Sequence, residues 1–251
     1  MNTKKTYSYN DFWQMHGRQS IWVTRNVSYR FGAVLALLAS KMGVTPNMIS
    51  ILSASITVIS ACLVIGMGQE SWLAGVILIV GLQLGYAFDC ADGPLARATG
   101  QGSSFGSLSD KMADLSSGMI FPCALAYGTD GYHVMVGSTP ISMGLGLLTL
   151  FLTARATLCV LMWLKESVIH KSDRLREDKR RKNLWWRLKK TMSLYIDEPI
   201  YRLAIALAWC AGLFWEFIMI YGAGIALITF VYIVSSKKEM DAMDREKVLR
   251  S

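Results

Sequence analysis

Long apolar stretches separated by short polar segments constrain this chain more than any other feature. An apolar run of about 20 residues is long enough to cross the hydrocarbon core of a bilayer as a helix. The 251 residues are 53% hydrophobic and only 18% charged, and a chain of this length with about six spans is expected to carry no large separate soluble domain. The sequence therefore predicts an all-α integral membrane protein with six transmembrane helices. The expected spans are residues 47–67, 71–97, 104–128, 138–164, 199–213 and 216–235.

Of the six expected spans, the fifth has the least support from the sequence. It is short, and Arg202 lies near its start. A single kinked unit over residues 199–235 would instead give five spans, and the sequence leaves this alternative open.

The first 43 residues are expected to lie in the membrane interface. Residues 29–42 are apolar but too short to span, and they carry Arg30 and Lys41, which favours an amphipathic helix in the headgroup layer. Residues 8–26 mix aromatic and basic side chains and predict a second interfacial segment. We therefore expect interfacial helices over 1–43, a six-helix membrane domain over 44–235 and a cytoplasmic tail over 236–251.

Lysine and arginine are distributed unevenly along the chain. The expected outer turns, 68–70, 129–137 and 213–215, contain neither residue, whereas residues 165–190 alone carry eleven. This positive-inside bias places both termini and the basic loop 165–198 in the cytoplasm. It also accounts for the net charge of +8, so no nucleic-acid partner is expected. The basic loop could in addition hold anionic headgroups of membrane lipids.

Acidic and small residues recur at helical spacing where the second and third spans meet. They are Asp89, Asp92, Gly93, Ala96, Arg97, Gly106, Asp110 and Asp114. Spacings of three, four and eight residues place the members within each span on one helix face. The intervening TGQGSS predicts a short turn, so both acidic faces should meet near the cytoplasmic end of an antiparallel hairpin.

The placement of several carboxylates next to the hydrocarbon core of a membrane calls for a physical explanation. Each unpaired one costs several kcal/mol, and their mutual repulsion adds to the cost. Divalent cations remove both penalties, because Mg²⁺ prefers oxygen ligands and shares them with phosphates. Paired ions about 3.5–4 Å apart can clamp an attacking and a leaving oxygen. The alternative is a set of interfacial charges paired with Arg97 and Lys111.

These eight residues form a DxxDGxxAR segment that is followed, after eight residues, by GxxxDxxxD. The combined pattern resembles the signature of the CDP-alcohol phosphotransferase family, and all eight fixed positions match. VTPNMIS at 44–50 is similar to the segment that opens the first span in that family. The resemblance implies a six-span homodimer in the cytoplasmic membrane of a prokaryote, with an active site that faces the cytoplasm. It also implies two Mg²⁺ or Mn²⁺ ions, a CDP-linked donor and an acceptor alcohol.

The same resemblance assigns roles to the acidic residues. Asp89, Asp92 and Asp110 would hold one metal ion, and Asp89, Asp110 and Asp114 would hold the second. Asp114 would also be the general base on the acceptor hydroxyl.

The resemblance further implies which residues contact the donor. Arg97 would bind a phosphate, which suits a guanidinium group. The expected nucleotide and donor contacts are Gly93, Ala96, Arg97, Ser103, Gly106 and Asn47.

Arg155 is the only basic residue deep in the fourth span, which makes it a candidate for a functional site. By resemblance it would contact an anionic acceptor or donor phosphate. The alternative is a structural partner for an acid on another span.

The expected reaction transfers a phosphoalcohol, with phosphatidyl from CDP-diacylglycerol preferred, to an acceptor alcohol with release of CMP in phospholipid biosynthesis. Transfer from CDP-choline or CDP-ethanolamine to diacylglycerol is the alternative. In members of the resembling family that use glycerol phosphate as the acceptor, lysine often follows the last aspartate. Here Leu115 follows it, which disfavours glycerol phosphate as the acceptor. An Asp-rich membrane prenyltransferase and a cation transporter are more remote readings.

Overall fold

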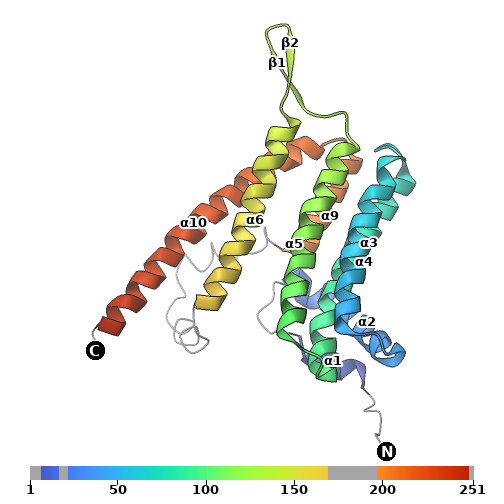
Figure 1. Cartoon of the computed structure of the whole chain (residues 1–251). Coiled ribbons are helices and arrows are strands. Elements are labelled where there is room, and N and C mark those ends of the chain that lie inside the picture. The colour runs from blue at the N-terminus through green and yellow to red at the C-terminus, as the bar shows by residue number, and fades with distance from the viewer. Residues whose placement is uncertain (1–6, 17–21, 169–196, 249–251) are drawn as a thin grey trace, which may run out of the picture. The chain divides into compact units, whose positions relative to one another are not determined.

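Helices make up most of the chain in the computed structural model, which describes residues 7–16, 22–168 and 197–248 (Figure 1). The elements are α1 Tyr9–Gln14, the π-helical turn η1 Thr24–Ser28, α2 Tyr29–Met42, α3 Pro46–Ile65, α4 Trp72–Thr99, α5 Ser104–Tyr127, β1 His133–Val136, β2 Thr139–Ser142, α6 Gly144–Val168, α9 Glu198–Cys210 and α10 Phe214–Val248. They divide into two compact units, of which the first lies within Met1–Gly131 and Ser193–Phe214 and the second within Tyr132–Met192 and Trp215–Ser251.

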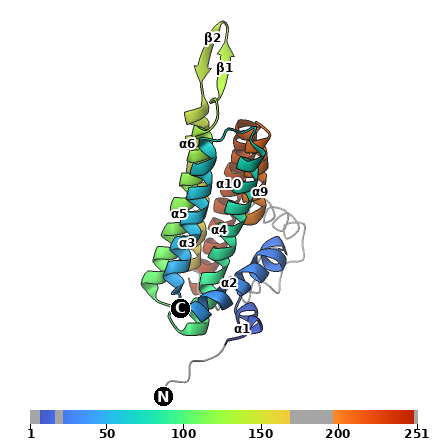
Figure 2. The ribbon, with the colours of Figure 1, turned by 90° about the vertical axis from the view of Figure 1, so that its right-hand side faces the viewer.

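In the first unit, α3 is the central helix. It packs closely against both α4 and α5, whereas the backbones of α4 and α5 approach each other much less closely. Helices α2 and α9 pack on α4, and α1 and α2 lie at the end of α4 from which the turn to α5 leaves (Figure 2). The acidic residues of α4 and α5 therefore face each other across a separation that α3 sets.

Small residues allow α3 and α4 to approach closely. Ser53 and Thr57 on α3 are buried, and the hydroxyl of Ser53 donates to the carbonyl of Gly85 at 2.8 Å. A Cβ at Gly85 would overlap Thr57 Oγ1 and lie 3.1 Å from the Ser53 carbonyl oxygen. Close approach over glycine and hydroxyl side chains is typical of helix pairs in membranes.

Among the residues that the structure describes, four helices are long and apolar enough to cross a membrane: Pro46–Ile65, Trp72–Thr99, Gly144–Leu164 and Phe214–Lys237. The other two expected spans form helices as well, but α5 carries charged residues in its first half and α9 has 13 residues. A helix of that length rises about 20 Å, less than the hydrocarbon thickness of about 30 Å. The structure thus agrees with an all-α membrane protein, and six spans remain a prediction.

Residues 199–235 form two helices rather than one kinked unit. Helix α9 ends at Cys210, and α10 begins at Phe214 after a turn in which Gly212 has a φ of 71°. Helix α10 then continues to Val248 without a break at residue 235.

The second unit contains a feature that the sequence analysis missed. Residues 133–136 and 139–142 form an antiparallel hairpin that pairs Val134 with Ile141, and α6 starts only at Gly144. The expectation of a helix from residue 138 is therefore wrong at its start, because the positive φ of Gly137 turns the chain back on itself. Within this unit, α6 packs on α10 through Phe151 and Tyr221, whose ring centroids lie 6.3 Å apart.

Residues 43–46 account for where the first long helix, α3, begins. Gly43 ends α2 with a φ of 73°, the side chain of Thr45 accepts the Met48 N–H at 3.4 Å, and Pro46 occupies the first helical turn. The placement of α1 and α2 in the membrane interface stays a prediction. Most of the basic loop, residues 169–196, lies outside the described residues.

Candidate active site

Carboxylates from α4 and α5 converge in the halves of these helices that lie nearer the short turn between them. One oxygen from each of Asp89, Asp92 and Asp110 lies within 4.8 Å of the others. The side chain of Asp114 is within hydrogen-bonding reach of Asp89, and that of Asp92 is within reach of Asp110. Carboxylates so close together repel each other unless a proton or a cation lies between them.

This donor set fits a divalent metal ion. The converging ligands are all carboxylate oxygens, which suit Mg²⁺ and Mn²⁺. Asp92 is only 8% exposed, so its charge is largely withdrawn from water and needs compensation from other groups. Asp114 is the most exposed residue of these four acids.

Ser50 on α3 orients one of the aspartates. Its hydroxyl donates to Asp92 Oδ2 at 2.5 Å and is itself only 8% exposed. The hydrogen bond restrains one oxygen of the carboxylate that also reaches Asp110. The sequence gives no signal for the role of Ser50, because a serine in an apolar span resembles any other small packing residue.

A buried cation lies behind the carboxylates. Arg202 of α9 is 4% exposed, and its guanidinium donates to Glu198 Oε1 at 3.0 Å, to Thr57 Oγ1 at 3.0 Å and to the Leu82 carbonyl at 3.3 Å. It is also near enough to Asp89 and Asp114 to interact electrostatically with both. Arg202 therefore offsets part of the negative charge of the cluster from inside the helix bundle.

The predicted donor-binding residues lie on the same ends of the helices. The guanidinium of Arg97 lies against Gly93, where a Cβ would be 3.1 Å from the nearest guanidinium nitrogen. Ala96, half-buried, lies one turn after these acids on α4. Without a side chain at residue 93, Arg97 can fold back along the helix toward the carboxylates.

Ser103, Gly106 and Asn47 meet where α5 begins. A Cβ at Gly106 would lie 3.0 Å from both Asn47 Oδ1 and Ser103 Oγ. Ser103 is the N-cap of α5, and its hydroxyl accepts the Gly106 N–H at 2.9 Å. The structure therefore gives Ser103 a local role in starting the helix, and it places Asn47 of α3 beside that turn.

Arg155 belongs to α6 in the second unit and is not among the residues that the first unit brings together. Its role in phosphate binding stays a prediction.

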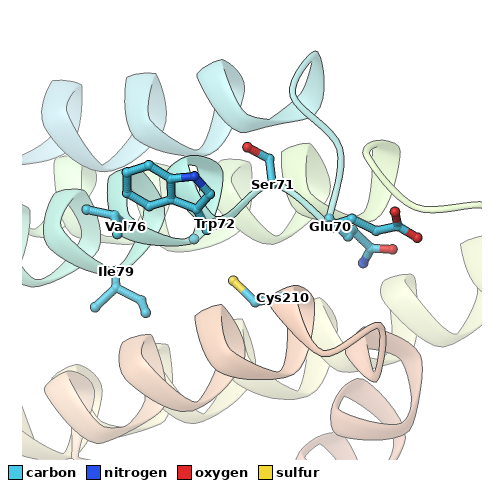
Figure 3. A pocket seen from close by; sticks show the side chains of 8 residues that line it. Glu70, Ser71, Trp72, Val76, Ile79 and Cys210 are labelled. Carbon is cyan, nitrogen blue, oxygen red and sulfur yellow. The ribbon is translucent and has the colours of Figure 1, made fainter.

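A pocket of about 320 Å³ lies at the opposite end of α4 from the aspartates. It is formed by the α3–α4 turn, the first turns of α4 and Cys210 of α9 (Figure 3). Trp72 and Asp89 are 17 residues apart in α4, or about 25 Å along the helix axis. The carboxylate cluster and this pocket are thus separate places in the first unit.

Comparison with known proteins identifies relatives of the chain. The family model described as CDP-alcohol phosphatidyltransferase matches residues 43–232. A phosphatidylinositol phosphate synthase of Corynebacterium glutamicum is 34% identical over 113 residues, which cover 43% of this chain and 49% of that protein. An archaetidylinositol phosphate synthase of Pyrococcus horikoshii is 38% identical over 99 residues, which cover 39% of this chain and 47% of that protein.

The match to these two curated relatives spans about half of their length. The family model, by contrast, covers about three quarters of the chain and includes every helix of the carboxylate cluster. The chain belongs to the CDP-alcohol phosphatidyltransferase family.

Proposed function

We propose that this protein transfers a phosphatidyl group from CDP-diacylglycerol to an acceptor alcohol and releases CMP. The observation that carries the proposal is the convergence of Asp89, Asp92 and Asp110 within 4.8 Å on helices α4 and α5. Family membership favours this reaction over a prenyl transfer or a cation path.

The carboxylates would hold the metal ions. Asp89, Asp92 and Asp110 would bind one ion, and Asp89, Asp110 and Asp114 a second. Bound Mg²⁺ or Mn²⁺ would neutralise the negative charge that builds up on the diphosphate during transfer.

The chain's own residues position and deprotonate the substrates. Arg97 binds a donor phosphate, and the absence of side chains at Gly93 and Gly106 leaves room for the nucleotide. Asp114 takes the proton of the acceptor hydroxyl as its oxygen attacks the β-phosphorus of the donor. The bond between that phosphorus and the oxygen of CMP breaks, and CMP leaves with the bonding electrons. A phosphodiester and a protonated Asp114 remain.

Inositol phosphate is the acceptor that we propose first. Both relatives are named for inositol phosphate products, and their matches fall in the same family. An anionic acceptor also needs cationic partners, and Arg155 is proposed as one of them.

The proposed setting is the cytoplasmic membrane of a prokaryote. We further propose that six helices cross the membrane and that α1 and α2 lie in its interface. Both termini would lie in the cytoplasm, and the protein would form a homodimer. The lysine and arginine distribution supports the orientation.

The test is a substrate panel with the full-length protein in lipid nanodiscs. CDP-diacylglycerol is combined in turn with inositol phosphate, glycerol phosphate and serine, and CDP-choline is combined with diacylglycerol. CMP and the lipid product are measured with Mg²⁺, with Mn²⁺ and with EDTA. We expect CMP release with CDP-diacylglycerol and inositol phosphate that EDTA abolishes.

The control is Asp92→Asn, which removes one carboxylate charge at nearly constant size and should abolish CMP release. Metal-independent turnover, or activity only with CDP-choline and diacylglycerol, would contradict the proposal. Product formation with a different soluble alcohol would retain the reaction and overturn the choice of acceptor.

A further inference from the structure

Helix α4 contains a proline in the part that carries the acidic motif. Pro94 lies inside the helix, four residues after Cys90. In an α-helix the carbonyl of one residue accepts the N–H of the residue four positions later, and proline has no N–H. The buried Cys90 carbonyl therefore lacks its usual backbone donor, in the turn that carries Asp89, Asp92 and Gly93.

A histidine from the N-terminal segment lies at this carbonyl. His16 Nε2 is 3.0 Å from the Cys90 carbonyl oxygen, although the two residues are 74 positions apart in the chain. The imidazole packs against Tyr29 of α2, with ring centroids 4.3 Å apart. The ring is thus held in place on α2 while its edge points at α4.

Both ring nitrogens of His16 lie next to carbonyl oxygens, which can only accept hydrogen bonds. Nδ1 lies 3.0 Å from the Phe12 carbonyl, which already accepts the Met15 N–H at 3.2 Å. The Cys90 carbonyl has no such helical donor. A proton on Nε2 therefore satisfies the carbonyl that the helix itself leaves without a partner.

The neighbouring contacts hold the N-terminal segment against the same stretch of α4. Phe12 is fully buried beside Ala91 and Leu95. Tyr7 donates its hydroxyl to the Ala98 carbonyl at 2.8 Å, in the last turn of α4, where carbonyls have no partner in the helix. The segment thus supplies donors at two places where α4 lacks its own.

We propose that His16 is a positioning residue, which donates its Nε2–H to the Cys90 carbonyl in place of the missing Pro94 N–H. The hydrogen bond holds the turn that presents Asp89, Asp92 and Gly93. The effect on turnover rests on the proposed function, whereas the hydrogen bond itself does not.

A matched pair of variants separates donation from packing. His16→Gln keeps an N–H donor, and His16→Phe keeps a ring on Tyr29 without any donor. In the full-length protein in nanodiscs we expect His16→Phe to lower kcat for CMP release about tenfold with little change in the acceptor KM. His16→Gln should stay within about threefold of the parent.

The link to the proline is tested by comparing Pro94→Ala with the double variant Pro94→Ala/His16→Phe. Pro94→Ala restores a backbone N–H for the Cys90 carbonyl, so His16→Phe should have little further effect in that background. Equal losses for the Gln and Phe variants, or the same His16→Phe effect in both backgrounds, would overturn the proposal.

Hydrogen–deuterium exchange gives a readout that needs no turnover. Amides within residues 86–99 should exchange faster in His16→Phe than in the parent, and the difference should shrink in the Pro94→Ala background. Unchanged exchange would overturn the role of His16. The expected difference in exchange, combined with no CMP release by the parent or any variant, would instead contradict the proposed function alone.

Discussion

The hydroxyl of Ser50 lies 2.5 Å from Asp92 Oδ2, and both residues are 8% exposed. A buried hydrogen bond to a carboxylate is stronger than one between neutral groups, and it holds the acid in one rotamer. Groups that orient metal ligands in this way tune the affinity of the site even though they do not touch the ion.

Ser50→Ala should therefore weaken metal activation. We expect the Mn²⁺ concentration for half-maximal CMP release to rise about 10–100-fold, because Asp92 loses the donor that orients it. The control is Ser55→Ala, the same change on the same helix at a half-buried position away from Asp92. An unchanged Mn²⁺ requirement in Ser50→Ala would show that the hydrogen bond does not orient the ligand.

Asp114→Asn should abolish turnover while part of the nucleotide binding remains. The amide cannot take a proton from the acceptor hydroxyl, whereas Gly93 and Arg97 are unchanged. CMP release and the binding of labelled CDP-diacylglycerol are measured side by side. Asp130→Asn, at an exposed acid beyond the end of α5, serves as the control. Undiminished CMP release by Asp114→Asn would rule out Asp114 as the base.

Arg202→Met should destabilise the first unit by about 3–5 kcal/mol, because it leaves Glu198 and the aspartates without a buried counter-charge. The double variant Arg202→Met/Glu198→Gln should recover part of the lost free energy of unfolding. Unfolding of the purified protein in detergent gives the measurement, with the exposed Arg25→Met as control. A single variant as stable as the parent would show that the buried cation is dispensable.

Gly85→Ala should separate α3 from α4 and lower both stability and activity. The new Cβ would overlap Thr57 Oγ1 and crowd the Ser53 carbonyl, and such overpacking costs about 1–3 kcal/mol. At Gly66, a Cβ would meet no atom of the described residues within 4 Å, and the φ of −79° suits alanine. Gly66→Ala is thus the matched control, and equal melting temperatures for the two variants would contradict the prediction.

The sequence predicts the arrangement of the motif because that arrangement is mostly local. Helical spacing alone places Asp89 with Asp92 and Asp110 with Asp114, and the TGQGSS turn brings the two pairs together. Thr45 and Pro46 likewise mark the start of α3 by rules that involve only neighbouring residues.

Contacts between distant segments escape this kind of reasoning. Nothing in the sequence around His16 indicates its role, because its partner is a backbone carbonyl 74 positions away whose usual helical donor is missing at Pro94. Arg202 was taken as a reason to doubt the fifth span, whereas in the fold it meets Thr57 and Glu198. The strands around Gly137 were missed because four residues each are too few to show an alternating pattern.

Helix α3 carries none of the eight motif residues, yet it packs against both helices that do, whereas the backbones of those two approach each other much less closely. The gap between the halves of the motif is therefore a property of the side chains along α3. Evolution can widen or narrow this gap by exchanging serine, threonine and alanine on that helix while every aspartate stays in place.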